Sequence, residues 1–250
     1  ADSTLIAIRD AQPPDLRGTA VMAPVLEAGD SPRVGRFGWK SQHASLQSFA
    51  AEAYLNEMGI TTPLLPEENT SNGRDVSRYD PVDDPEDDGV DVLAFADFMR
   101  STKAPSRGPI TPDVRAGQSL FNQIGCASCH TPSITTAPPG TPINGGAFAV
   151  PTALGNKIIH PHSDFLLHDV GTGDGVPSQP TAEAASTANQ MRTAPLWALR
   201  TRNRLMHDGL SFTTQDAIAR HAGQATGVKQ SYEGLLTSQK MQIQAFLDSL

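Results

Sequence analysis

Apolar residues recur every three or four positions in several stretches of the chain, which is the spacing of one face of an α-helix. The first predicted helix runs over 45–58, where Ser45 can cap the start and Gly59 follows the end. A second helix is predicted over about 91–100. The residues of these helices expected to face inward are Leu46, Phe49, Ala50, Ala53, Tyr54, Val92, Leu93, Ala96 and Met99.

A third helix is predicted over 111–124, between the capping residue Thr111 and Gly125. Pro112 suits its first position, because the first turn of a helix leaves its amide hydrogens unbonded. The final helix, over about 238–250, is expected to pack against this third helix. The apolar residues expected at that contact are Met241, Phe246, Leu247 and Leu250.

The remaining stretches lack a helical period. Residues 1–40 are expected to be irregular, because Pro13 and Pro14 interrupt any repeat. Residues 61–90 are predicted to form a long loop and residues 101–110 a linker. The chain has 21 glycines and 20 prolines in 250 residues, so many turns are expected between the helices.

Both cysteines of the chain lie in one pentapeptide, Cys126-Ala-Ser-Cys129-His130, directly after the third predicted helix. This C-x-x-C-H spacing is the attachment motif of a c-type haem, in which two thiols form thioethers with the haem and the histidine binds its iron. A structural zinc site would need a second pair of ligands, and no further cysteine exists. A thioredoxin-like motif would need a βαβ context. The sequence therefore predicts one covalently attached haem c.

This motif sets the expected fold class and location. The fold is predicted to be mostly α: a cytochrome c-like helical haem domain with long irregular loops and an N-terminal helical extension. The haem domain is predicted over 106–250, with the extension, over 1–105, packed on it. Covalent haem attachment takes place outside the cytoplasm, so the protein is expected in the periplasm or another exported compartment.

The charge of the chain narrows its expected partners. A formal net charge of −8 disfavours nucleic acid and favours a basic redox protein as partner. No run of 18 apolar residues is present, so no membrane span is expected.

The second axial ligand decides whether a haem carries electrons or performs chemistry. A strong ligand closes the iron, whereas an open position admits peroxide or oxygen. His43 lies far upstream of the motif and is a weaker candidate. The other candidates for this position are His160, His162, His168, His207, His221, Met191 and Met206.

Several separated motifs resemble one family. Residues 191–199 (MRTAPLWAL) and 206–209 (MHDG) are similar to the C-terminal domain of bacterial dihaem cytochrome c peroxidases and MauG-like proteins. Residues 35–40 (GRFGWK), 58–62 (MGITT) and 165–171 (FLLHDVG) narrow the resemblance to the dihaem oxidoreductase family of peroxidase-like proteins, also labelled thiol oxidoreductase-like. The resemblance extends over nearly the whole chain and implies a C-terminal cytochrome c domain.

The resemblance implies the second iron ligand. His221 lies 14 residues after His207, where the peroxidase relatives carry an axial methionine. His130 and His221 are therefore the expected iron ligands. The alternative is that His221 caps the end of its own helix, which is predicted from Thr213 to Gly223.

Other residues are expected to surround the haem. Arg192 is expected to pair with a propionate, because a guanidinium matches a carboxylate at two points; a surface ion pair is the alternative. Trp197 and Phe165 are expected to pack in the haem pocket. His168 and His207 are expected to hydrogen-bond to backbone, aspartate or a propionate, with iron binding as the alternative for either.

Electron transfer through one low-spin haem with two histidine ligands is the first functional hypothesis, and it assigns no catalytic residue. The second is a peroxidase-like enzyme with an open distal side, where His168 or His207 would act as an acid/base. A haem-based sensor ranks last, because no signalling module is present.

The family carries a further C-x-x-C-H in an N-terminal domain, where the peroxidase relatives reduce peroxide, and this chain lacks that motif. The chain is therefore expected to be the electron-transfer half of a longer dihaem protein or a one-haem version. Its partner would be that missing haem domain or a separate redox protein.

Acidic residues cluster before the second predicted helix. Clustered carboxylates can bind calcium, but their order differs from that of an EF-hand loop. A solvated acidic loop that caps the next helix is the favoured interpretation. The residues are Asp80, Asp83, Asp84, Glu86, Asp87, Asp88 and Asp91.

Overall fold

The predicted capping residues mark where the helices begin. The computed structural model describes residues 1–250 as a mostly α fold, with α-helices α1 (Asp2–Ala11), α2 (Leu46–Ala53), α3 (Val90–Ser101), α4 (Pro112–Gln123), α5 (Thr214–Ala219), α6 (Thr226–Glu233) and α7 (Thr237–Leu247). The hydroxyls of Ser45, Thr111 and Thr213 accept hydrogen bonds from main-chain amides in the first turns of α2, α4 and α5. These three caps were predicted and are confirmed.

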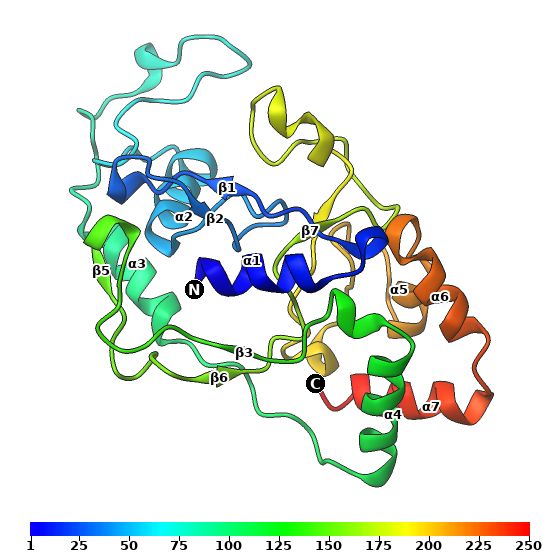
Figure 1. The fold of residues 1–250 in the computed structure, drawn as a ribbon. Helices are drawn as coiled ribbons and strands as arrows, with labels where there is room; N and C mark the ends of the chain where they lie inside the picture. Colours follow the sequence, from blue (N-terminus) through cyan, green and yellow to red (C-terminus); the bar gives the residue numbers. More distant parts are fainter.

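The strands are two residues long and form antiparallel pairs. The pairs are β1 (Met22–Ala23) with β2 (Arg33–Val34), β3 (Ile134–Thr135) with β6 (Ile158–Ile159), β4 (Pro142–Ile143) with β5 (Phe148–Ala149), and β7 (Leu167–His168) with β8 (Met191–Arg192). Figure 1 shows α4 to α7 gathered at one end of the molecule, α2 and α3 at the other, and α1 between them.

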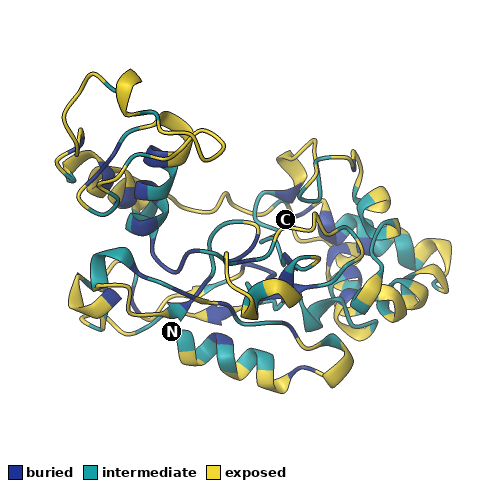
Figure 2. Cartoon of the chain, turned by 90° about the horizontal axis from the view of Figure 1, so that it is seen from above, coloured by how far each residue is buried: buried dark blue, intermediate teal, exposed yellow.

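The N-terminal segment contains a helix, α1, so the expectation that residues 1–40 are irregular was wrong. The proline pair follows this helix and ends it rather than preventing it. Leu5 is buried in a small apolar cluster with residues of β2 and β3, and Asp2 pairs with Arg33 and Arg36. Tertiary contacts therefore stabilise a helix too short to be stable alone. Figure 2 shows it at the outside of the molecule, beside the N-terminus.

A small core lies between α2 and α3. The helix predicted to end near Met58 does so through a π-helical turn, Tyr54–Met58, and Gly59 follows with a φ of 68°. The predicted inward face is correct only in part, because Leu93 is 43% exposed. The buried residues of this core are Ala50, Ala51, Tyr54 and Val92.

The larger core forms where α4 crosses α7, which confirms the predicted packing of the last helix on the helix before the cysteines. The helices approach closely at Gly117, where an added Cβ would lie 1.9 Å from the carbonyl oxygen of Gln242. Met241 was predicted to face this core but is 68% exposed, because α7 turns Ile243 inward instead. The buried residues are Val114, Phe121, Leu199, Ile243, Phe246, Leu247 and Leu250.

Gly117→Ala is expected to lower the free energy of unfolding by about 3 kcal/mol, because the new methyl group would overlap the α7 backbone. Gly227→Ala is the matched control. Gly227 lies in α6, and no atom lies within 4 Å of an added Cβ, so this change should stabilise by up to about 1 kcal/mol. Denaturant unfolding followed by circular dichroism compares the two, and equal stabilities would contradict a tight α4–α7 crossing.

Candidate haem-binding site

A cavity of about 400 Å³ opens beside the α4–α7 core. This volume lies within the range of roughly 300–1,000 Å³ that is usual for cofactor and ligand pockets. Hydrophobic residues make up 19 of the 31 that line it. Helices α4, α5, α6 and α7 each contribute, and Leu16 and Trp39 reach it from the N-terminal half of the chain. The cavity is therefore a mainly apolar site built from segments distant in sequence.

Both cysteines line this cavity. Gly125, with a φ of 104°, ends the α4 segment, and a single 3-10 turn, Cys126–Ser128, carries the chain past the cavity wall. Burial raises the pKa of the Cys126 thiol to about 12. Burial also raises the pKa of Cys129, and the negative charge of Asp164 raises it further. Both thiols are therefore protonated at neutral pH, with little tendency to bind a metal ion as thiolates.

His130 presents one ring nitrogen to the cavity. Its Nδ1 lies 2.9 Å from the carbonyl oxygen of His162, so Nδ1–H donates and Nε2 carries the lone pair. Burial is the main reason that the pKa of His130 falls to about 4. The imidazole is therefore neutral near pH 7, as iron binding requires.

His221 repeats this arrangement in the same cavity. Its Nδ1 lies 2.7 Å from the carbonyl oxygen of Ala217, which again leaves Nε2 as the free acceptor. Burial lowers the pKa of His221, and the charge of Lys229 lowers it further. The cavity thus contains two neutral imidazoles whose Nε2 atoms make no hydrogen bond.

His221 lies beyond the end of α5, so the prediction of a helix reaching Gly223 was wrong. The amides of Ala222 and Gln224 instead donate to the carbonyl oxygens of Val170 and Asp169. These bonds draw the chain out of the helix after Ala219 and fix the segment against the loop that follows β7.

The structure separates the other candidate ligands into two groups. His168, His207, Met191 and Met206 line the cavity. His160 and His162 do not, and His43 pairs with Glu52 elsewhere.

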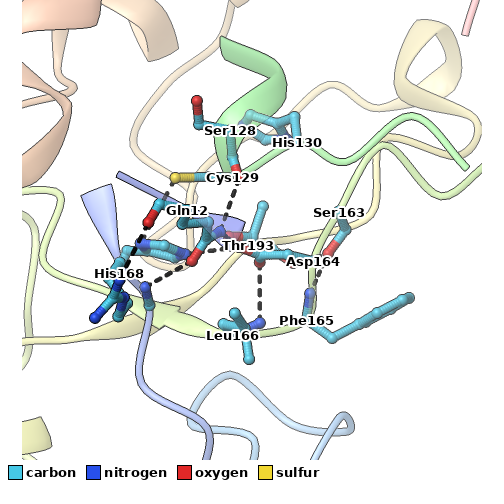
Figure 3. A network of polar contacts seen from close by, with 12 residues as sticks. Gln12, Ser128, Cys129, His130, Ser163, Asp164, Phe165, Leu166, His168 and Thr193 are labelled. Atoms are coloured by element: carbon cyan, nitrogen blue, oxygen red, sulfur yellow. Dashed lines mark hydrogen bonds and ion pairs between the residues drawn. The ribbon is translucent and has the colours of Figure 1, made fainter. Parts of the chain in front are cut away.

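A buried polar network lies beside Cys129 (Figure 3). The ring of His168 bridges Cys129 and Asp164: its Nδ1 is 3.6 Å from Cys129 Sγ and its Nε2 is 2.8 Å from an Asp164 carboxylate oxygen. The Gln12 amide donates to the same Asp164 oxygen and to the carbonyl oxygen of Ser128, at 2.7 Å each. Neither Gln12 nor Asp164 was among the residues predicted to surround the haem. No motif marks them, because they meet only in the folded chain.

The cavity also contains polar groups suited to carboxylates, and no carboxylate of the chain pairs with them. Arg192 Nε donates to the carbonyl oxygen of Gly38 at 2.7 Å, and burial, followed by the charge of Arg202, lowers the pKa of Arg192 to about 10. The hydroxyl of Thr172 is buried without a hydrogen-bond partner. Two neighbouring cations and a free hydroxyl in an apolar cavity fit the propionates of a haem.

The aromatic residues of the cavity differ from those expected. Trp197 and Phe165 do not line it. Trp39 does, although it is 43% exposed, and its ring lies 6.2 Å from that of His207 in an edge-to-face arrangement. Trp39 belongs to the GRFGWK segment, which resembles the family, but nothing in the sequence of that segment indicates contact with the cavity.

The acidic loop lies away from this cavity. Glu86 accepts a hydrogen bond of 2.7 Å from the amide of Thr61, and Asp88 accepts one of 3.0 Å from Val90 at the start of α3. Carboxylate oxygens of Glu68, Asp80 and Asp84 lie within 4.8 Å of one another. A solvated acidic loop stays the favoured prediction, with calcium binding as its alternative.

A mainly apolar cavity that contains a C-x-x-C-H motif and two unbonded imidazole nitrogens suits the haem of a redox protein. The chain belongs to the family described as "Di-haem oxidoreductase, putative peroxidase", whose model matches residues 21–250. The structure contains no helix with the length and hydropathy that a membrane span requires.

The solved structures that are similar to the chain include a MauG-like protein and a hydrazine synthase. A MauG-like protein associated with microbial copper homeostasis matches 100% of this chain and 89% of its own, with 13% identity and a TM-score of 0.48. Hydrazine synthase of Kuenenia stuttgartiensis matches 64% of this chain with 20% identity and a TM-score of 0.39, and the match spans 55% of that longer protein. No curated protein matches the chain.

Proposed function

We propose that the protein transfers electrons through one haem attached to Cys126 and Cys129, with His130 and His221 as the axial ligands. The main observation that supports this is the presence of two neutral imidazoles in one cavity, each with Nδ1 bonded to a main-chain carbonyl and Nε2 free. A bound haem would supply an iron that accepts and releases one electron.

In this proposal, the role of the polypeptide is to hold the two imidazoles in fixed orientations. The carbonyl oxygens of His162 and Ala217 fix the tautomer and ring plane of His130 and His221. The mainly apolar residues of the cavity wall favour the less charged state of the site. Arg192 is the residue we assign to a propionate. Imidazoles held in this way would let a bound haem change its oxidation state with little reorganisation of the polypeptide.

A peroxidase-type activity is the second candidate function. It is favoured by His168, which lines the cavity and is held by the buried carboxylate of Asp164, as a proton-transfer group would be. We assign this activity only to a longer dihaem protein that includes a second haem domain. We also propose that the protein resides in an exported compartment, because covalent haem attachment takes place outside the cytoplasm.

The response of the absorption spectrum to peroxide and cyanide distinguishes electron transfer from peroxidase activity. With both axial positions filled by histidine, the oxidised protein should keep its absorption spectrum on addition of either molecule, and it should reduce and reoxidise reversibly. His221→Ala, which opens one position, should respond to cyanide and serves as the positive control. A rapid spectral change of the unaltered protein with peroxide would instead favour the peroxidase.

A further inference from the structure

The charged residues that line the haem cavity are all cations. They are Arg192, Arg202, Arg204 and Lys229, and no aspartate or glutamate is among the 31 lining residues. The whole chain has 27 acidic and 19 basic residues, with a net charge of −8. The sign of the charge at the cavity is therefore opposite to that of the molecule.

None of these cations is neutralised by a carboxylate of the chain, because none forms an ion pair. Arg202 donates to the carbonyl oxygen of Trp197 at 2.7 Å, and Arg204 lies over the Phe212 ring at 4.4 Å from its centroid. Carbonyl and ring contacts leave the full positive charge in place.

Two of these arginines mark the mouth of the cavity. Arg202 and Arg204 are exposed to solvent and also line the cavity, whereas Lys229 is half-buried. Asp208, a nearby carboxylate in the chain, does not offset them. It is already paired with Arg220 at 3.1 Å, and that contact is the main reason that the pKa of Asp208 falls to about 2. We call Arg202, Arg204 and Lys229 the cationic rim.

We propose that the cationic rim receives a redox protein whose own electron-transfer edge is surrounded by aspartate and glutamate. This rests on the proposed electron-transfer function. Even if Arg192 and one rim arginine each pair with a propionate, two positive charges remain at the place where an electron would enter or leave. This partner is opposite in charge to the basic one that the net charge of the chain favoured.

Electrostatic screening decides whether a partner responds to the cationic rim or to the negative net charge of the chain. At an ionic strength of about 0.1 M the Debye length is roughly 10 Å, so the acidic residues on distant parts of the molecule are largely screened. A partner close to the cavity therefore experiences the rim. Steering of this kind typically changes association rates by about 10-fold to 1,000-fold, and it weakens as salt is added.

Two small oxidants, one an anion and one a cation, test the sign of the electrostatic potential at the cavity mouth. The reduced holoprotein is mixed with ferricyanide, an anion, or with tris(phenanthroline)cobalt(III), a cation; each accepts one electron from the protein. Stopped-flow absorbance gives second-order rate constants from about 0.1 to 0.5 M ionic strength, where the Debye length is roughly 10 Å or less and the distant acidic residues are screened. The rate with ferricyanide is expected to fall about tenfold over this range, and the rate with the cobalt complex to stay level or rise.

Arg204→Glu and Lys103→Glu form a matched pair, since each changes the net charge by the same amount. Lys103 is exposed on the segment after α3 and does not line the cavity. Arg204→Glu should slow ferricyanide about tenfold at low salt, while Lys103→Glu should slow it less than twofold. Arg204→Gln removes the charge without adding a carboxylate and should give an intermediate rate.

A ferricyanide rate that rises with ionic strength would overturn the proposal, because it would show that the net charge of −8 governs the approach. Equal effects of Arg204→Glu and Lys103→Glu would overturn it as well. If neither oxidant changed the haem absorbance, the proposed electron-transfer function would fail, and the partner proposal with it.

Discussion

The double variant Cys126→Ala/Cys129→Ala is expected to yield protein without covalently bound haem. The two thiols are the only ones in the chain and both line the cavity, so no other group can form the thioethers. Intact mass under denaturing conditions should equal that of the polypeptide alone, whereas the unaltered protein should carry one additional haem. The variant should also be much less stable, because its mainly apolar cavity would lose the group that fills it.

Ser128→Ala is the control for this experiment. Ser128 lies between the two cysteines but does not line the cavity, and its carbonyl oxygen, which accepts the Gln12 bond, is kept. This variant should retain one haem. A double cysteine variant that still carried haem through denaturation would show that the attachment is wrongly assigned.

His221→Met is expected to keep the haem attached and to raise the reduction potential on the order of 0.1 V, part of the ~0.8 V range that axial ligands control. A thioether stabilises the reduced iron relative to an imidazole. The variant also loses the bond from Nδ1 to Ala217 that holds the ring in place. Redox titration followed by absorbance measures the potential and the spectral change together.

His207→Met is the matched control, because His207 lines the same cavity and lies before an aspartate but is not assigned to the iron. The reduction potential of His207→Met should differ from that of the unaltered protein by much less than the potential of His221→Met does. If His207→Met changed the axial spectrum and His221→Met left it unchanged, the second ligand would have to be reassigned.

Local signals in the sequence were sufficient for the helices with strong caps and for the attachment motif. Ser45, Thr111 and Thr213 cap within three residues of their own position, and the motif is contiguous, so neither depends on distant contacts. The helix α1 could not be predicted in this way. It is stabilised by contacts that cross the fold, such as Asp2 with Arg33, and short helices depend on such packing.

The candidate site also combines features that the sequence predicts with features that arise only from contacts in the folded chain. His221 was assigned through resemblance to relatives, and the structure places it in the cavity that His130 also lines. The pairing of Gln12 with Asp164 joins residues 152 positions apart, and no periodicity or spacing predicts it. Likewise, net charge averaged over the chain concealed the cationic lining of the cavity, because composition carries no information about position.

The low-temperature electron paramagnetic resonance spectrum of the oxidised protein is the most direct test of the central claim, that one haem is held between His130 and His221. A single low-spin signal typical of two imidazole ligands, equal in amount to the protein and unchanged by cyanide, is the predicted result. A high-spin signal as the main component would contradict it, because one side of the iron would then be open.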